Sequence, residues 1–151
     1  MRLPHVIPFG KFPLYFFTAC TQGRRAVLAC PEALSILTEV WTKSASLDGW
    51  QVGRFMLMPD HVHFFAMPAL AAKPRADWIK MWKSVSARRL IRDHGLQPPL
   101  WQEDTFDHLM RSAESYAEKW NYVRENPVRA GYCATAGEWP WQGEVNVLRM
   151  Q

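Results

Sequence analysis

The order of secondary-structure patterns along the chain predicts an α+β fold, a sandwich of the split βαβ type in which an antiparallel sheet carries helices on one face. The length of 151 residues fits one domain with a substantial core. Hydrophobic residues make up 48% of the chain and charged residues 21%, which excludes a disordered chain. Patterns typical of strand, helix, strand, strand, helix and strand follow one another, with a further helix behind them. We therefore expect a single domain over residues 1–151.

The first half of the chain contains three strand patterns and one helix pattern. A β-prone aromatic run ends before the turn at Gly23. Apolar residues then recur at helical spacing behind Pro31, a residue suited to the first helical turn. The Pro59-Asp60 break between two further apolar runs is typical of a hairpin. These patterns predict strands at 14–20, 50–58 and 61–67 and a helix at 31–47.

The second half predicts a basic amphipathic helix, a short strand and a third helix. Trp78 and Trp82 lie on an apolar stripe at helical spacing, so we expect both rings in the core rather than stacked on bases. Gly95 is a stop signal for that helix. Ser112 is suited to cap the third helix, and Pro127 is expected to end it. The predicted elements are a helix at 76–94, a short strand within 101–110 and a helix from 112 to about 126.

The chain is basic, with 18 lysine and arginine residues against 14 acidic ones and a formal net charge of +4. This balance favours a polyanionic partner. The excess lies between residues 71 and 100, and we expect its cations to contact DNA phosphates, although a solvated helix face would give the same pattern. These cations are Lys73, Arg75, Lys80, Lys83, Arg88, Arg89 and Arg92.

Three features predict a cytoplasmic protein. The three cysteines are odd in number and form no C-x-x-C pair, which argues against a disulfide framework or a zinc ribbon. The longest nearly apolar run, residues 64–72, is broken by Pro68 and is too short to span a membrane. The segment that holds Pro4 and Pro8 has no long apolar region and no small-residue cleavage site, so we expect no signal peptide.

The sequence Met58-Pro59-Asp60-His61-Val62-His63 holds a pair of histidines in a predicted strand. At about 3.3 Å rise per residue, His61 and His63 point to the same face about 6.6 Å apart. Both imidazoles can therefore reach one metal ion or one phosphate. Two histidines that merely form hydrogen bonds on a sheet face would give the same pattern.

The third predicted helix carries two tyrosines on different faces. At about 100° per residue, Tyr116, Trp120 and Val123 form one apolar stripe. Tyr122 lies about 120° away from Tyr116, with Asn126 as its i+4 neighbour. An exposed phenol beside a cation and a carboxamide suits a nucleophile, although an ordinary surface tyrosine fits the same position. We expect Tyr116 in the core.

Three separate motifs resemble, in the family's order, those of the REP-associated tyrosine transposases. These enzymes are part of the larger group of single-tyrosine HUH transposases, which act on single-stranded DNA. The resemblance extends from the early strand to the tail at 138–141. The three motifs are Met58-Pro59-Asp60-His61-Val62-His63, then Trp101-Gln102 with Phe106-Asp107-His108 and Arg111, and then Tyr122-Val123-Arg124-Glu125-Asn126-Pro127-Val128-Arg129-Ala130-Gly131.

The resemblance implies a ferredoxin-like domain that nicks and rejoins single-stranded DNA next to a palindromic hairpin. It implies that His61 and His63 bind a divalent ion, Mg²⁺ or Mn²⁺, with Asn126 as the third ligand. Tyr122 is implied as the nucleophile, which would form a 5′-phosphotyrosine intermediate. Lys119, one turn before it, is a candidate to activate the phenol and to contact DNA.

Two other functions stay open on the sequence alone. One is a metal-dependent hydrolase that uses the H-x-H pair without covalent catalysis, and the other is a non-catalytic protein that binds structured DNA or RNA. His94 and His108 are further candidates for metal ligands. A monomer and a homodimer are both compatible with the sequence, and a DNA-processing enzyme is expected at the nucleoid.

Overall fold

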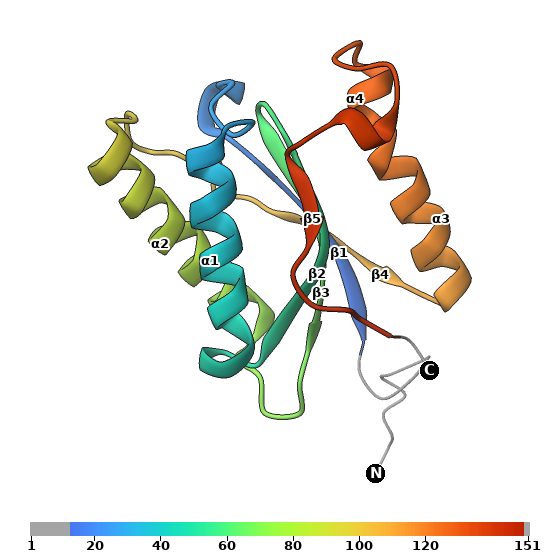
Figure 1. Ribbon diagram of the computed structural model, residues 1–151. Coiled ribbons are helices and arrows are strands. Elements are labelled where there is room, and N and C mark those ends of the chain that lie inside the picture. Colours follow the sequence, from blue (N-terminus) through green and yellow to red (C-terminus); the bar gives the residue numbers. More distant parts are fainter. Residues whose placement is uncertain (1–12, 150–151) are drawn as a thin grey trace.

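The structure, a computed structural model, describes residues 13–149 and shows one sheet between helices on its two faces (Figure 1). Pro4 and Pro8, on which the prediction of no signal peptide depends, lie outside these residues. The strands are β1 (Leu14–Cys20), β2 (Trp50–Met58), β3 (His61–Pro68), β4 (Phe106–Met110) and β5 (Gln142–Glu144). The helices are α1 (Pro31–Leu47), α2 (Arg75–His94), α3 (Ala113–Arg124) and α4 (Asn126–Arg129).

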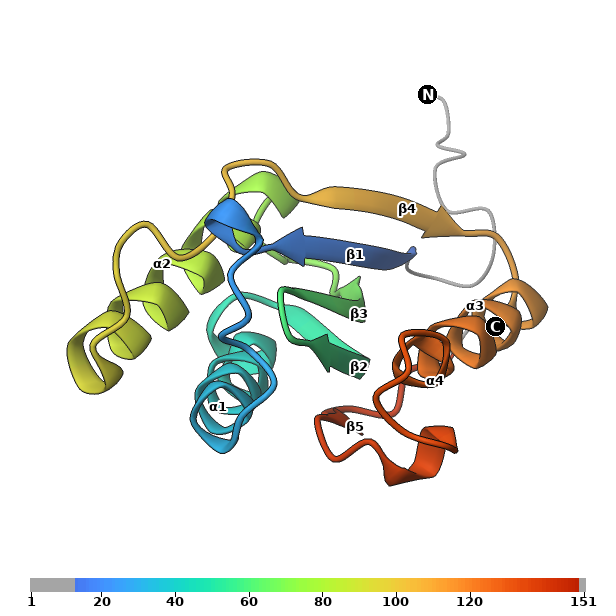
Figure 2. The same cartoon turned by 90° about the horizontal axis from the view of Figure 1, so that it is seen from above.

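The strands lie in the order β4-β1-β3-β2-β5, and every neighbouring pair is antiparallel (Figure 2). Because β3 pairs antiparallel with both β1 and β2, these two strands run in the same direction with β3 between them. Helix α1 connects them, which makes this unit a split βαβ. Helix α2 connects β3 to β4 in the same way, around β1. The predicted α+β fold of split βαβ type is therefore confirmed.

Helices α1 and α2 cover one face of the sheet and enclose the larger core. Trp41 from α1 and Trp82 from α2 meet edge to face, with ring centroids 5.7 Å apart, above the ring of Phe64 from β3. Trp78 is fully buried, and its indole N–H donates to Ser44 Oγ at 3.0 Å, which satisfies a donor that burial removes from water. The prediction that Trp78 and Trp82 belong to the core is confirmed.

Helix α3 departs from the predicted arrangement, because it packs on the opposite face of the sheet (Figure 1). The ring of Tyr116 lies 4.7 Å from that of Phe65, and Arg54 from β2 lies 5.7 Å from the rings of both Tyr116 and Trp120. The cause is the composition of β2 and β3, which carry apolar residues on both faces, as strands covered on both sides do. Helices therefore lie on two faces, not on one.

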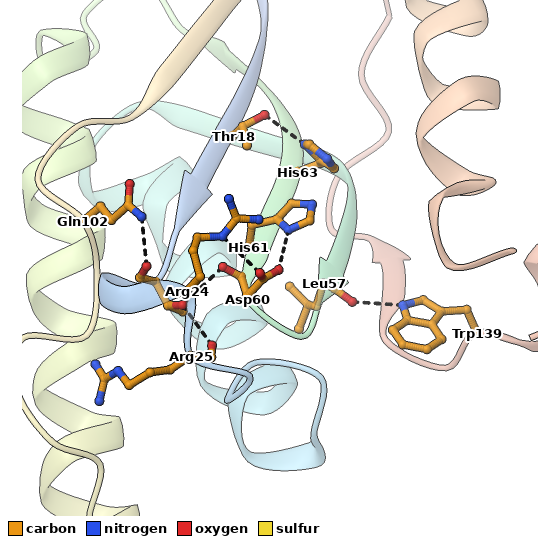
Figure 3. A network of polar contacts seen from close by, with 10 residues as sticks. Thr18, Arg24, Arg25, Leu57, Asp60, His61, His63, Gln102 and Trp139 are labelled. Carbon is orange, nitrogen blue, oxygen red and sulfur yellow. Dashed lines mark hydrogen bonds and ion pairs between the residues drawn. The ribbon is translucent and has the colours of Figure 1, made fainter. Parts of the chain in front are cut away.

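The C-terminal tail closes the free side of β2. Trp139 is buried and donates its indole N–H to Leu57 O at 2.9 Å (Figure 3). Further along, the backbone N–H of Asn146 donates to Val52 O at 2.9 Å. The tail lies so close to the bulge in β2 that a Cβ at Gly53 would be 2.6 Å from Leu148 Cδ1. Any larger residue at position 53 would require the Leu148 side chain to shift.

The predicted elements are present with small shifts at their ends. Ser112 caps α3 as predicted, through a hydrogen bond from the backbone N–H of Ser115. Pro127 ends the third helix early but lies in the first turn of α4, where its missing N–H is tolerated. Strand β5 was not predicted, because its three residues carry no strand pattern. Within residues 13–149, no helix combines the length and the apolar character needed to cross a membrane.

Candidate active site

The side chains of His61 and His63 lie together on the sheet face that α3 covers in part. Alternation along β3 sends Val62 and Phe64 into the core under α1 and α2 and the two histidines to the other face. The imidazole centroids are 4.7 Å apart, with ring planes inclined at 77°. The two side chains therefore form one cluster, as the H-x-H spacing predicted.

Each imidazole uses its Nδ1 atom in a hydrogen bond with the protein (Figure 3). His61 Nδ1 lies 2.8 Å from Asp60 Oδ1, and His63 Nδ1 lies 2.9 Å from Thr18 Oγ1. Next to a carboxylate, His61 carries its proton on Nδ1, so the lone pair of Nε2 is available. A carboxylate behind a histidine is a common way to orient a metal ligand and raise its basicity.

Asp60 is itself held by Arg24, whose Nε donates to Asp60 Oδ2 at 3.0 Å. Partial burial alone would raise the pKa of Asp60, but the hydrogen bonds from His61 and Arg24 outweigh it and hold that pKa below its ordinary value. The carboxylate therefore stays charged and keeps accepting the proton of His61 Nδ1. Sequence reasoning did not single out Arg24, which the turn after β1 brings to the β2–β3 hairpin.

His63 lies deeper than His61. Its ring stacks on Phe16 from β1 at 5.2 Å between centroids. Burial, together with the positive charges of His61, Lys119 and Arg129, lowers the pKa of His63 to about 3. The imidazole is therefore neutral at physiological pH, and a neutral imidazole is the form that binds a metal ion or accepts a proton.

Helix α3 places Tyr122 over the same sheet face. Tyr122 is 61% exposed, whereas Tyr116 is buried, as the helical wheel predicted. Lys119 connects the helix to the histidine cluster, because its Nζ lies 4.9 Å from the ring centroid of Phe16 and 5.9 Å from that of Tyr122. Burial also raises the pKa of Tyr116, which makes that phenol a poor nucleophile.

Arg129 from α4 was not predicted as a site residue, although it contacts both the predicted nucleophile and the predicted third ligand. Its guanidinium carbon lies 3.9 Å from the ring centroid of Tyr122. One Nη atom donates to Tyr122 O at 2.9 Å and also to Asn126 Oδ1. The i+7 spacing from Tyr122 could have placed Arg129 on the same helix face, but Pro127 predicted that the helix had ended.

The site offers two of the ligands that a divalent ion needs, the imidazoles of His61 and His63. Two imidazoles with free Nε2 atoms and fixed Nδ1 partners are a donor pair of the kind metal ions use. Within residues 13–149, no cluster of three or more His, Cys, Asp and Glu residues could hold an ion, so a third ligand has to be of another type. The carboxamide oxygen of Asn126 is turned toward Arg129 and keeps a second lone pair. Its role as a ligand stays a prediction.

The basic residues of α2 lie on the other side of the sheet from the histidine cluster. Four of the predicted DNA contacts form ion pairs within the chain, Lys73 with Asp48, Arg75 with Asp107, Arg89 with Glu39 and Arg92 with Asp93. Among the described residues, no ion pair involves Lys80 or Arg88, and both are exposed. His94 ends α2, so the structure does not bring it to the histidine cluster, whereas His108 lies on β4 opposite Phe16.

Lys83 differs from the other cations because it is buried. Its ammonium donates to the backbone carbonyls of Gln102, Glu103 and Asp104, at 2.7, 3.2 and 3.3 Å. Burial lowers the pKa of Lys83, and the neighbouring Asp104 carboxylate opposes that effect. The structure therefore gives Lys83 a role in fixing the segment before β4, and its ammonium is not free to contact a phosphate.

A hollow of about 360 Å³ lies between β4 and α3 and opens beside Tyr122. The strand contributes His108 and Arg111 to its wall, and the helix contributes Glu118, Lys119 and Tyr122. Tyr122, the predicted nucleophile, therefore has open space on its β4 side. The histidine cluster borders the same region through Phe16, whose ring contacts both Lys119 and His63.

Comparison with known proteins shows what the chain is similar to. No family model matches the chain. A REP-associated tyrosine transposase of Escherichia coli K12 is 22% identical over 128 residues, which cover 84% of this chain and 73% of that protein. A candidate protein of the same kind from Haemophilus influenzae is 23% identical over 142 residues, which cover 88% of this chain and 80% of that protein.

Two solved structures share the fold. A REP-associated tyrosine transposase bound to a REP hairpin aligns with a TM-score of 0.72 at 19% identity and covers 93% of this chain and 82% of that one. A transposase candidate from Deinococcus radiodurans R1 aligns with a TM-score of 0.58 at 23% identity and covers 83% of this chain and 97% of that one. The chain is thus a homologue of transposases, and the resemblance to REP-associated tyrosine transposases that the three motifs predicted is confirmed.

The depressed pKa of His63 predicts that stability falls in acid. Between about pH 6.5 and pH 3 the unfolded chain carries a proton on His63 that the folded chain does not, so the free energy of unfolding should fall as the pH drops, by about 1.4 kcal/mol per pH unit. The loss should reach about 2 kcal/mol at about pH 5 and should be absent in His63→Gln. Urea unfolding with a chelator present measures this loss.

His94→Gln, which alters an exposed histidine, is the control and should keep the wild-type pH dependence. Equal slopes for wild type and His63→Gln would contradict the prediction.

Proposed function

We propose that this protein cleaves and rejoins single-stranded DNA through a covalent 5′-phosphotyrosine on Tyr122. The observation that carries the proposal is the position of Tyr122, an exposed phenol stacked against Arg129 on the same sheet face as His61 and His63. The similarity to transposases supports the same reaction class. A nucleophile on one element and a phosphate-orienting pair on another is the arrangement that such a transfer requires.

Each residue of the site has a distinct role in the proposed reaction. The scissile phosphate lies at the histidine cluster, and the phenolic oxygen of Tyr122 attacks phosphorus. The bond from phosphorus to the 3′ oxygen breaks, that oxygen leaves with the electron pair and gains a proton, and the phenol loses its own proton. Lys119 and Arg129, both beside the Tyr122 ring, place positive charge where negative charge develops. Rejoining reverses these steps with an incoming 3′-hydroxyl.

A divalent ion, Mg²⁺ or Mn²⁺, bound by His61 and His63 with Asn126 as a third donor, would supply Lewis-acid polarisation of the scissile phosphate. The chain prepares these ligands in advance. Asp60 and Thr18 fix the imidazole orientations through Nδ1, and Arg129 fixes the carboxamide of Asn126 through its oxygen. Fixed ligands lose little conformational entropy when the ion and the DNA bind.

The DNA partner we propose is a single strand next to a palindromic hairpin, bound by a monomer or a homodimer at the nucleoid. The exposed cations of α2, together with Lys119, supply the positive charge that a folded strand attracts. One solved relative is bound to a REP hairpin, which supports this substrate class. The contacts of α2 with DNA rest on Lys80 and Arg88 rather than on Lys83.

Tyr122→Phe should abolish the covalent adduct with single-stranded DNA, because the change removes only the attacking oxygen of an exposed ring. The adduct is detected by denaturing electrophoresis and mapped by mass spectrometry to the peptide that holds Tyr122. Tyr116→Phe is the matched control on the same helix and should keep activity, since that ring packs in the core. An adduct on Tyr116, or one that persists in Tyr122→Phe, would refute the mechanism.

Removing the ion or one of its ligands should stop cleavage but leave DNA binding largely intact, because binding depends on cations and stacking. A chelator, His61→Ala and His63→Ala should each reduce cleavage to background, and Mn²⁺ or Mg²⁺ should restore it only in the wild type. Electrophoretic mobility shifts measure binding in parallel. Cleavage at the wild-type rate in either alanine variant would exclude the metal site.

Replacing an exposed cation of α2 should weaken hairpin binding and reduce its salt dependence. Lys80→Gln and Arg88→Gln should each lower the slope of log affinity against log salt by about 0.7 on a single strand and about 0.9 on a duplex. Lys43→Gln on α1 removes an exposed positive charge elsewhere and should leave the slope unchanged. Unchanged slopes in the α2 variants would show that this helix face is only solvated.

A further inference from the structure

Helix α3 covers only part of the sheet face that carries the histidine cluster. Tyr116 and Trp120 pack on Phe65, and Leu14 and Met110 are buried in the same layer. Toward the β2–β3 turn the face carries polar and exposed groups instead. That part of the face is lined by His61, His63, Thr18, Phe106 and His108.

Phe106 begins β4 and is 64% exposed on this uncovered face. In the sheet register, Phe106 is opposite Thr18 on β1, and Thr18 is opposite His63 on β3. Directly opposite residues point to the same face, so the three side chains form one row across the sheet. At about 4.8 Å per strand, Phe106 lies roughly 10 Å from His63. An exposed ring thus extends the row that starts at the histidine cluster.

A single exposed apolar side chain needs no explanation by itself, but this one lies in the same row of side chains as Thr18 and His63, on the strand that also borders the hollow beside Tyr122. His108, two residues along β4, points to the same face and lines the hollow beside Lys119 and Tyr122. Arg111 lines the same hollow. An aromatic ring for a base, with positive charge alongside for the backbone, is the combination that binds single-stranded nucleic acid.

We propose that Phe106 is a binding residue for DNA, on which an unpaired base of the strand stacks a short distance from the phosphate at the histidine cluster. The inference deepens the proposed function and rests on it for the position of that phosphate. Because every base has an aromatic face, the contact tolerates any sequence and serves to hold the strand across the β4 edge. His108 borders the same part of the face and lies between this base and Tyr122.

The test measures binding without cleavage, in the Tyr122→Phe background and without divalent ions. A fluorescein-labelled thymidine oligonucleotide serves as the probe, and fluorescence anisotropy gives the affinity. Phe106→Ala should weaken binding roughly 5- to 150-fold, the range that alanine substitution at a base-stacking ring gives. Phe106→Trp should bind at least as tightly as the parent. Because no charge is removed, the salt dependence should be the same in both variants.

Leu70→Ala is the matched control, because Leu70 is also an exposed apolar residue, 91% exposed in the turn that follows β3, whereas His61 lies at the other end of that strand. It should bind like the parent. Far-ultraviolet circular dichroism should show all variants folded, as expected for changes at exposed positions. Affinity of Phe106→Ala within about twofold of the parent would overturn the proposal.

A second measurement locates the contact directly. An oligonucleotide in which thymidine is replaced by 5-iododeoxyuridine, irradiated on the protein, should crosslink to the peptide that holds Phe106. Crosslinks confined to other peptides would overturn the proposal. The proposed function is tested separately by the Tyr122 adduct, so the two can fail independently. An adduct with unaltered Phe106→Ala binding would remove only the stacking site, whereas a stacking effect without any adduct would remove only the covalent mechanism.

Discussion

The pairing of β1 with β3 is the constraint on which the site depends. It aligns Thr18 with His63 and Cys20 with His61, so the hydroxyl that holds one imidazole comes from the neighbouring strand in register. A shift of one residue would turn both histidines into the core under α1 and α2. The aromatic packing on that side, with Phe17 on Phe64 at 5.1 Å, prevents the shift because these rings would then face the opposite layer. The packing of the core thus fixes the position of the two histidines.

The candidate site combines residues of the central sheet with residues of helices that pack on the sheet. The histidines lie on the central strand of the sheet, whereas Tyr122 and Asn126 come from helices that pack on one sheet face through a small set of aromatic contacts. Arg129 contacts both Tyr122 and Asn126. Lys119 contacts Phe16, whose ring stacks on His63. Positive side chains thereby link the histidine strand to the helices that carry Tyr122 and Asn126, and in the proposed reaction the same charges would face a phosphate.

Local patterns were enough to predict most of the fold, the pairing of the two histidine side chains and the exposure of Tyr122. The strand alternation at His61 and His63 and the helical wheel of Tyr116 and Tyr122 depend only on backbone periods, and they gave the correct faces. The sheet face on which α3 packs could not be predicted from periodicity, because it depends on apolar residues of strands that are far away in the sequence. The burial of Lys83 and the contacts of Arg129 have the same cause, since their partners are set by how segments meet in space rather than by spacing along the chain.

The close fit between Gly53 and Leu148 has a consequence for solubility. The tail that this contact seats occupies the hydrogen-bonding side of β2, through backbone bonds such as that from Asn146 to Val52. A Cβ at position 53 would force the Leu148 side chain to shift, and a tail displaced from this place would leave part of β2 with unpaired amides and carbonyls. An open strand edge pairs readily with strands of other molecules, so the seated tail protects β2 from self-association and aggregation.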